Sequence, residues 1–281
     1  MNARISAAVT RHGAPPESLM PKVSVITPSY NQAQFLERTI RSVLEQDYPN
    51  IEYIIIDGGS TDGSVDIIRR YADRLAYWVS EPDRGQAHAI NKGLQRATGV
   101  WVAWQNSDDV FYPGAFAQLA QMAQQQPDAD LIIGNMNLID QDDRMLRDIK
   151  YVRPTYRALL AEGMVLTNQA AFWRRSLHDQ IGYLDETLDC GFDYEWFLRV
   201  LNGGRAAAHV NASWGGLRMH EDTKTSKRQE VFEREYRKIL EGRQASWVSR
   251  KYHQLRRLML MLAQGDFRYV FRGLVKRMLS Q

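Results

Sequence analysis

Short apolar segments that alternate with amphipathic ones constrain the fold of this chain more than any other feature. Residues 23–28 (VSVITP) and 53–57 (YIIID) are apolar, rich in β-branched side chains and followed by turn residues, which predicts buried strands. Between them, apolar residues recur three and four positions apart from Phe35 to Leu44, which predicts a helix. Further elements follow: strands at 76–79 and 100–105, a helix at 87–97, a strand pair at 130–140 and a helix at 194–201. This alternation predicts an α/β fold with a mostly parallel sheet covered by helices on both faces.

Three regions are expected along the 281 residues. Residues 1–20 show no hydrophobic periodicity and lack the apolar run of a signal peptide, so a flexible leader is predicted there. Residues 21–227 are expected to form one large α/β domain, in which the half 118–227 closes a crevice against the half 21–117. A hydrophobic content of 44% is enough for a large core. Residues 228–281 are expected to form a basic amphipathic helical tail.

The net charge of +3 is distributed unevenly. Residues 243–281 contain nine Lys and Arg and one acid, a net charge of +8 that leaves −5 for the rest. Over 267–278 apolar residues recur at helical spacing, and three basic residues lie four apart on another face (Arg268, Arg272, Lys276). A helix in a membrane interface has this pattern, and so has a helix docked on the domain with a solvated basic face. Because no nucleic-acid recognition motif accompanies the charge, no nucleic-acid partner is expected.

Cys190 is the one cysteine of the sequence, which excludes an internal disulfide and fits a reducing cytosol. No segment reaches the ~20 consecutive apolar residues of a membrane-spanning helix. A cytoplasmic protein is therefore expected, held peripherally at the inner face of the cytoplasmic membrane if the tail binds lipid.

Polar residues follow each strand expected in the first half. They fall at 27–30, 57–60, 80–84 and 106–109. In parallel sheets, ligands bind beyond the carboxyl ends of the strands. The four loops are therefore expected to surround one crevice.

Asp57 follows three isoleucines and precedes Gly58 and Gly59, which allow a ligand to approach the backbone closely. Its carboxylate can accept hydrogen bonds from a nucleobase or a ribose hydroxyl, or it can cap the turn that follows. At the next helix start, Asp62 and Ser64 are predicted to be caps.

Asn106, Ser107, Asp108 and Asp109 end an apolar run (VWVAW). Adjacent carboxylates at a strand end suit a divalent cation such as Mg²⁺ or Mn²⁺, which takes oxygen ligands and keeps positions for a diphosphate. The alternative for Asp109 is to cap a helix that begins near Pro113.

The segment 80–93 (SEPDRGQAHAINKG) offers three polar side chains to a ligand. Arg84 and Lys92 can neutralise phosphate, and Asn91 can bridge the backbone to the ligand. A turn that leads into a solvated helix explains the same residues.

Two carboxylates, Asp193 and Glu195, begin the aromatic helix expected within 191–200 (GFDYEWFLRV). A carboxylate in partly apolar surroundings has a raised pKa, which suits a general base, whereas acids in a first turn also complement the helix dipole. Positions two apart on a helix point apart, so one of them is expected to face the crevice, and Asp193 is preferred. Later, His220 offers a metal ligand or is a solvated histidine.

Together these segments resemble glycosyltransferase family 2, the inverting sugar transferases with the GT-A fold. The resemblance rests on VSVITPSYNQAQFLERTIRSVLEQDYPNIEYIIIDGGSTDGS, on SEPDRGQAHAINKGLQRATG and on WQNSDD. It is close over 23–117 and thinner over 168–226. It implies a Rossmann-like, mostly parallel central sheet and transfer of a sugar from a nucleotide-sugar donor, with UDP preferred, to an acceptor hydroxyl. A Mn²⁺ or Mg²⁺ cofactor is implied, and a glycan or lipid-linked glycan acceptor of cell-surface polysaccharide or glycolipid synthesis is expected.

The resemblance also implies roles at single positions. Thr27, Pro28 and Tyr30 would line the nucleotide pocket, Asp57 would hold the base, Asp108 would bind the metal, Asp193 would deprotonate the acceptor and His220 would complete the metal site. The remaining expected site residues are Gly59, Arg84, Asn91, Lys92, Asn106 and Ser107 for the nucleotide-sugar, Asp109 for the metal and Glu195 as a second acid beside Asp193. Two residues depart from the family pattern: Asn106 replaces the first acid of an Asp-x-Asp motif, and Phe192 replaces an acid often found before Asp193.

Two other functions use similar parts. A sugar-1-phosphate nucleotidyltransferase usually has a glycine-rich basic loop after its first strand, whereas this loop reads PSYNQAQ. A non-catalytic sugar-nucleotide-binding protein would retain Asp57 and tolerate loss of Asp193. A dinucleotide oxidoreductase is disfavoured because no G-x-G-x-x-G follows the first strand.

Overall fold

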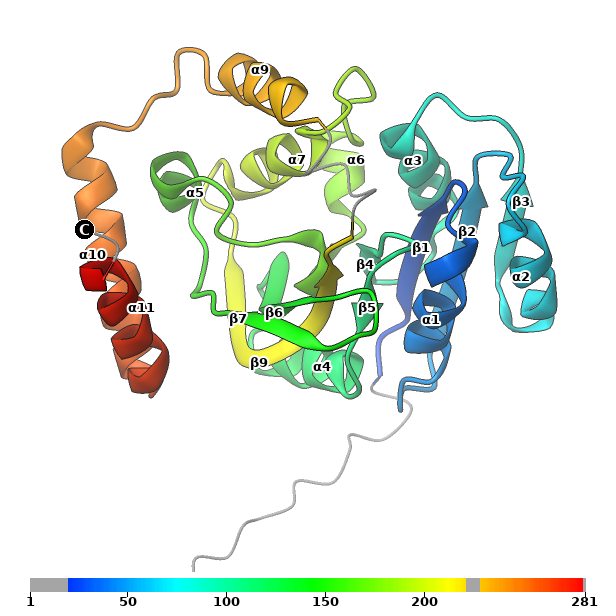
Figure 1. Ribbon diagram of the computed structural model, residues 1–281, viewed down its shortest axis with the longest axis horizontal. Helices are drawn as coiled ribbons and strands as arrows, with labels where there is room; N and C mark the ends of the chain where they lie inside the picture. Colours follow the sequence, from blue (N-terminus) through cyan, green and yellow to red (C-terminus); the bar gives the residue numbers. More distant parts are fainter. Residues whose placement is uncertain (1–19, 221–227, 280–281) are drawn as a thin grey trace, which may run out of the picture.

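A mixed nine-stranded sheet organises the part of the chain that the computed structural model describes, residues 20–220 and 228–279 (Figure 1). Its strand order is β3-β2-β1-β4-β8-β6-β9-β5, and β7 pairs with β6 outside that path. The first four strands are parallel: β1 (Val23–Ser29), β2 (Ile51–Asp57), β3 (Tyr77–Ser80) and β4 (Trp101–Trp104). The others run in both directions: β5 (Val110–Phe111), β6 (Leu131–Ile139), β7 (Met145–Ile149), β8 (Ala171–Arg174) and β9 (Ala207–Arg218). The predicted α/β fold is confirmed.

Helices cover the parallel half of the sheet on both faces, since all seven residues of β1 are buried. The helices of the domain are α1 (Ala33–Leu44), α2 (Ser64–Arg70), α3 (Gln86–Arg96), α4 (Ala115–Gln125), α5 (Tyr156–Glu162), α6 (Leu177–Ile181) and α7 (Phe192–Leu201). Three more follow: α9 (Gln229–Ile239), α10 (Trp247–Ala263) and α11 (Phe267–Leu279). A strand that is apolar on both faces needs cover on both, which explains the near-continuous apolar run of β1.

The carboxyl ends of the parallel strands lie level with one another. Ser29 is opposite Asp57, and Asp57 is opposite Ser80. Gln105, which follows β4, donates its backbone N–H to the carbonyl oxygen of Ile26 at 2.8 Å. The loops that leave these strands therefore start at one edge of the sheet, where ligands of such folds bind.

The strand pair expected at 130–140 is instead one strand. β6 runs from Leu131 to Ile139 and pairs with β7, β8 and β9. Gly134 in its middle makes room for a side chain of β9, because a Cβ there would lie 2.4 Å from Cγ of Trp214. The glycine marks a close approach between strands, not a turn.

Aromatic side chains fix α7 against the sheet. The ring centroids of Trp104 and Trp173 are 5.0 Å apart, and those of Trp173 and Trp196 are 5.9 Å apart. Phe197 stacks on Trp104 at 6.1 Å. Large buried rings contribute much of the packing energy of a core, so the position of Asp193 in the first turn of α7 is tied to the centre of the domain.

The helices after residue 227 contact the domain rather than stand apart from it. Ile239 of α9 is buried in the core, and the ring of Tyr236 stacks on that of Tyr194 at 4.5 Å. α10 packs on α5, where Nε of Arg257 lies 2.9 Å from Oε2 of Glu162. In Figure 1, α10 and α11 lie at the edge of the molecule beyond α5 and β7. Among the described helices, none has the length and apolarity needed to cross a bilayer.

Candidate active site

A cavity of about 720 Å³ opens at the carboxyl edge of the parallel strands. Its walls are the loops after β1, β2, β3 and β4 and the end of β9. Seven of the expected site residues line it: Pro28, Tyr30, Gly59, Asn106, Ser107, Asp108 and Asp109. The crevice expected from the strand ends is therefore present.

Asp108 and His220 meet at this edge. Nε2 of His220 lies 3.0 Å from Oδ2 of Asp108, and about a fifth of the Asp108 side chain is exposed. The His220 ring also packs on Phe35, with 4.6 Å between centroids. Arg218 fixes the loop after β4, because its Nε donates to the carbonyl oxygen of Asp108 at 2.7 Å. A carboxylate and an imidazole thus face each other on a rigid support.

Asp109, expected as a metal ligand, holds the loop together instead. Its Oδ2 accepts hydrogen bonds from Gln169 (2.7 Å) and Asn106 (2.9 Å), and its Oδ1 accepts one from the backbone N–H of Arg218 (2.9 Å). Burial and the neighbouring charge of Asp108 raise the pKa of Asp109. It does not cap a helix near Pro113 either, because β5 intervenes and α4 begins at Ala115.

Asp57 also departs from its expected role. It is fully buried, and four donors bond its carboxylate: the N–H groups of Gly59 and Ser60 and the hydroxyls of Ser60 and Ser80, at 2.6–3.1 Å. The carboxylate therefore caps the turn, which is the alternative that the sequence left open. Thr27 is likewise buried and bonds the hydroxyl of Tyr53 at 2.9 Å. Neither side chain lines the cavity.

The polar side chains expected to bind phosphate, Arg84 in the loop before α3 and Asn91 and Lys92 on α3, do not line the cavity. Asn91 is buried and bonds Leu184 in both directions at 3.0 Å. Lys92 pairs with Glu81, and Arg84 pairs with Glu186 at 2.5 Å. These contacts attach α3 to neighbouring segments. The three residues therefore fit the alternative interpretation of the sequence, a turn that leads into a helix.

Asp83 lines the cavity where Arg84 was expected. Its Oδ1 accepts the N–H of Gly85 at 2.7 Å. Its Oδ2 lies 2.6 Å from the point where a Cβ on Gly58 would stand, and the ring of Tyr30 is 3.3 Å from the same point. A carboxylate oxygen beside an exposed aromatic ring suits the N–H groups and flat face of a nucleobase. The preceding proline and following glycine signalled a turn but not which side chain would face inward.

Asp193 lies in the first turn of α7, where its Oδ1 accepts the N–H of Tyr194 at 2.7 Å. Burial raises the pKa of Asp193 to about 6. Asp193 itself does not line the cavity. Asp189, four positions earlier, does line it, and so does Arg228, the ion-pair partner of Asp189. Glu195 is engaged in a two-point pair with Arg199, at 2.6 and 2.8 Å. Asp193 therefore remains the candidate base, because the carboxylate of Glu195 is engaged by Arg199.

The start of α7 depends on a residue that the sequence did not single out. Glu235 of α9 is only 7% exposed, and it accepts three backbone N–H groups at 2.8–2.9 Å, those of Asp189, Cys190 and Gly191. Gly191 is the N-cap of α7, whose N–H has no intrahelical partner, and Asp189 and Cys190 form the segment that leads into the helix. A carboxylate from 44 to 46 residues away satisfies these N–H groups here, and no local pattern predicts it.

A divalent cation fits the Asp108–His220 pair in part. The pair offers the carboxylate of Asp108, which lines the cavity, and the imidazole of His220, which contacts that carboxylate from behind the wall. Oδ1 of Asn106 accepts a hydrogen bond from Gln86 at 2.8 Å. Among the described residues no group of three His, Cys, Asp or Glu side chains converges on one point. A cation here would take the rest of its ligands from a diphosphate and water, as Mg²⁺ and Mn²⁺ do.

Comparison with known proteins decides the family. The model of glycosyl transferase family 2 matches residues 24–182, more than half of the chain. The chain belongs to glycosyltransferase family 2. This confirms the resemblance seen in the sequence and identifies the protein as a member of a family of enzymes.

Two relatives with glycosyltransferase in their names agree with this membership. An uncharacterized glycosyltransferase of Mycobacterium tuberculosis (strain H37Rv) is 36% identical over 183 residues, 64% of this chain and 69% of the relative. The protein TuaG of Bacillus subtilis (strain 168), whose name assigns it to teichuronic acid biosynthesis, is 48% identical over 92 residues, 32% of this chain and 36% of that protein.

Two solved structures share the fold at lower identity. S. aureus TarS 1–349 in complex with UDP-GlcNAc gives a TM-score of 0.63 at 20% identity, covering 78% of this chain and 65% of that one. The mannosyltransferase PcManGT of Pyrobaculum calidifontis in complex with GDP-Man and Mn²⁺ gives 0.60 at 22% identity, covering 80% of this chain and 66% of that one. This family 2 protein thus spans about two thirds of the length of either structure.

Proposed function

We propose that this family 2 protein transfers a sugar from a nucleotide-sugar, with UDP as the preferred nucleotide, to an acceptor hydroxyl with inversion at the anomeric carbon. The observation that carries the proposal is the contact of His220 with Asp108, a carboxylate that lines a cavity built from strand-end loops. Asp83, Gly58 and Tyr30 would hold the base at the far end of the cavity. The printed ligands of TarS and PcManGT support a nucleotide-sugar donor.

In the proposed reaction, Asp193 accepts the proton of the acceptor hydroxyl as its oxygen attacks the anomeric carbon. The bond from that carbon to the diphosphate breaks, and the nucleoside diphosphate leaves with the electron pair. A pKa of about 6 leaves most of Asp193 ionised at neutral pH, as a general base requires.

Arg218 and Arg228 line the cavity and would donate to the leaving diphosphate, although each is also paired with a carboxylate, Arg218 with Asp143 and Arg228 with Asp189. A Mn²⁺ or Mg²⁺ ion held by Asp108 and His220 would add charge stabilisation of the diphosphate oxygens.

We also propose that the acceptor is a glycan or lipid-linked glycan of cell-surface polysaccharide or glycolipid synthesis, and that the C-terminal helices contact the membrane surface. The name of TuaG supports the first part. Two exposed aromatic side chains on α11, Phe267 (62%) and Phe271 (68%), support the second. Of the basic residues expected there, Arg272 pairs with Asp148 at 2.8 Å, and the side chain of Lys276 lies outside the described part.

A donor screen tests the transfer function. The protein is incubated with UDP-, GDP- and dTDP-sugars in the presence of Mn²⁺ or Mg²⁺, and nucleotide release is measured. We expect release from a UDP-sugar, lost in Asp108→Ala and kept in the control Asp142→Ala, an exposed acid of the β6–β7 turn. Binding of a nucleotide-sugar without release of nucleotide from any donor would instead indicate a sugar-nucleotide-binding protein. Pyrophosphate release from a nucleoside triphosphate and a sugar-1-phosphate would indicate a nucleotidyltransferase.

A further inference from the structure

A second cavity, of about 980 Å³, lies away from the strand ends. Its walls are the segment that leads into α5, the turn after α7 and the first turns of α10. The transfer reaction proposed above uses none of these residues.

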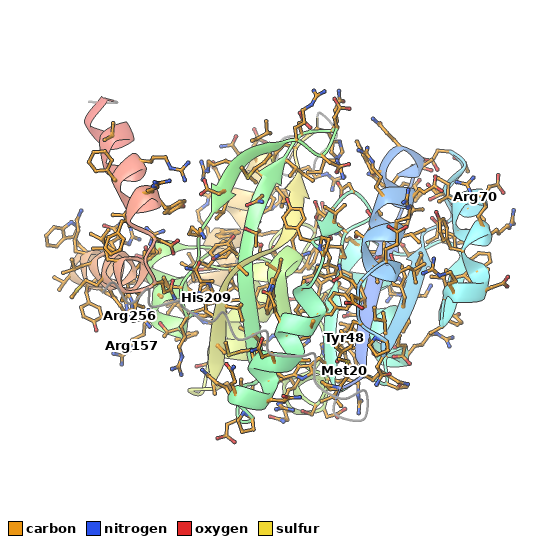
Figure 2. All side chains as sticks on the ribbon, turned by 90° about the horizontal axis from the view of Figure 1, so that it is seen from below. Met20, Tyr48, Arg70, Arg157, His209 and Arg256 are labelled. Atoms are coloured by element: carbon orange, nitrogen blue, oxygen red, sulfur yellow. The ribbon has the colours of Figure 1, made fainter. Side chains whose placement is uncertain are left out.

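The charge of this cavity is of one sign. Among the described residues that line it, four are arginines, Arg153, Arg157, Arg205 and Arg256, and none is acidic. Within the described part of the chain, none of the four forms an ion pair with a carboxylate, whereas Arg257, the next residue on α10, pairs with Glu162 at 2.9 Å. Figure 2 shows Arg157 and Arg256 close together beside α10. Glu162 of α5 interacts with the charge of Arg256, but it does not line the cavity. The charges that face the cavity are therefore positive, and they attract an anion.

Arg256 and Arg205 have only weak or neutral partners. The two terminal nitrogens of Arg256 reach the carbonyl oxygen of Arg153 at 3.5 Å, the limit of a hydrogen bond. Arg205 donates to the carbonyl oxygen of Asn202 at 3.0 Å and to Oε1 of Gln180 at 3.3 Å. Guanidinium groups carry five donors in a planar fork that matches phosphate oxygens. Both arginines therefore retain donors for a ligand.

His253 adds a buried ring nitrogen at the same wall. The residue is 6% exposed and lines the cavity, and its Nδ1 has no hydrogen-bond partner among the described residues. Burial and the charges of Arg256 and Arg157 lower the pKa of His253. A buried polar atom without a partner is costly and rare in native proteins. In the tautomer that carries its proton on Nδ1, His253 would donate to a phosphate oxygen.

An apolar stripe begins at the rim of the cavity. Val248 (68% exposed) and Tyr252 (61%) both line it, and Leu255 (56%) and Met259 (62%) continue the stripe along α10 at intervals of three and four residues. Single exposed apolar residues are ordinary, but a stripe along one helix marks an interaction surface. A basic pocket beside an apolar helix face matches the chemistry of a lipid: a charged phosphate next to acyl chains.

The far end of α10 is fixed, so the stripe has a defined orientation. Asp266, after α10, pairs with Lys150 at 3.3 Å and accepts a hydrogen bond from Asn211 at 3.1 Å. Gln264 contacts Nδ1 of His209 at 3.2 Å. These contacts attach the junction of α10 and α11 to β9 and to the residue after β7.

We propose that the cavity between α5 and α10 binds the phosphate headgroup of an anionic membrane lipid, with Arg157, Arg256 and His253 on the phosphate and the α10 stripe in the membrane interface. The inference rests on the proposed membrane contact of the C-terminal helices and is independent of the transfer reaction. It adds a defined pocket and a ligand chemistry to that contact.

Vesicle flotation of the full chain tests the proposal. The vesicles are phosphatidylcholine with and without phosphatidic acid. We expect the parent to float with the anionic vesicles, and the double variant Arg157→Gln/Arg256→Gln to bind about 30-fold more weakly, since each basic residue near an anionic surface contributes roughly fivefold. The matched control is Arg234→Gln/Arg237→Gln, which removes the same charge from exposed positions of α9. Melting curves by circular dichroism check that both variants are folded.

Each other outcome overturns the proposal at a different step. A parent that does not float shows that the membrane contact itself is wrong. A parent and double variant that float alike, or a control that loses as much binding as the double variant, show general charge attraction without a pocket. Calorimetry with inorganic phosphate tests whether the ligand is a soluble phosphate instead of a lipid. Tight binding of free phosphate, together with unchanged flotation of Tyr252→Ser, would assign the pocket to a soluble phosphate ligand.

Discussion

Nε2 of His220 lies 3.0 Å from Oδ2 of Asp108, although the two residues are 112 positions apart. The contact joins the loop after β4 to the end of β9, so it connects the two halves of the sheet at the candidate active site. Both residues are held in place: the ring of His220 packs on Phe35, and the backbone carbonyl of Asp108 accepts a hydrogen bond from Arg218. Donor atoms held in this way need little reorganisation when a ligand binds.

Asp193→Asn tests the general base. We expect turnover of the nucleotide-sugar to fall by roughly 10²–10⁴-fold, because positioned proton transfer contributes that much, while the affinity for UDP stays unchanged. The raised pKa of Asp193 means that its ionised form is disfavoured in the folded protein, so the variant should be at least as stable to urea at pH 7.5. A variant with parental turnover would place the base elsewhere.

The pH dependence of turnover follows from the same pKa. A base with a pKa of about 6 is protonated and inactive below that pH. The rate under saturating donor should therefore fall about tenfold for each pH unit below 6 and level off above it. An acid limb near pH 4, the ordinary range of an aspartate, would contradict the assignment.

Asp57→Asn should act on stability. The carboxylate accepts four hydrogen bonds in a fully buried turn, and an amide can accept only with its one oxygen. We expect the free energy of unfolding to fall by about 2–4 kcal/mol, measured by urea denaturation. The control Asp66→Asn removes an exposed carboxylate of α2 and should cost less than about 0.5 kcal/mol. A loss of UDP affinity at unchanged stability would restore the base-binding role.

Glu235→Gln tests whether α9 positions the base. The amide keeps one acceptor oxygen for three backbone N–H groups, so the first turn of α7 should loosen. We expect turnover to fall severalfold while the KM for the donor stays within about twofold, because the donor cavity is formed mainly by other elements. A parallel rise in KM would indicate a general structural defect. The exposed Glu233→Gln, on the same helix, is the matched control.

The sequence predicted the elements better than it predicted individual contacts. The alternation of strands and helices, and the rule that ligands bind at strand ends, placed Asn106 to Asp109 at the cavity because both depend on local pattern. The direction in which a polar side chain points depends on its partner in another segment. Asp57 is bonded by Ser80, Asn91 by Leu184 and Lys92 by Glu81. A polar residue near a site is often used by a neighbouring backbone group or charge, and such pairings are not visible along the chain.

Long-range partners explain the remaining differences. Glu235 stands in a highly charged helix and gives no local sign that it caps α7. A strand pair was expected at 130–140, but Gly134 there lies within one strand because it makes room for Trp214, which is 80 residues later. Both residues are explained by what packs against them in the folded protein.

The account depends most on Asp108 and His220 holding a cation that binds a nucleoside diphosphate. Calorimetric titration of UDP, with Mn²⁺ and with a chelator, measures this directly. We predict that Mn²⁺ strengthens UDP binding by about tenfold or more in the parent and has no effect in Asp108→Asn/His220→Gln, while metal-free binding is equal in both. An equal effect of Mn²⁺ on the parent and the double variant would contradict the account.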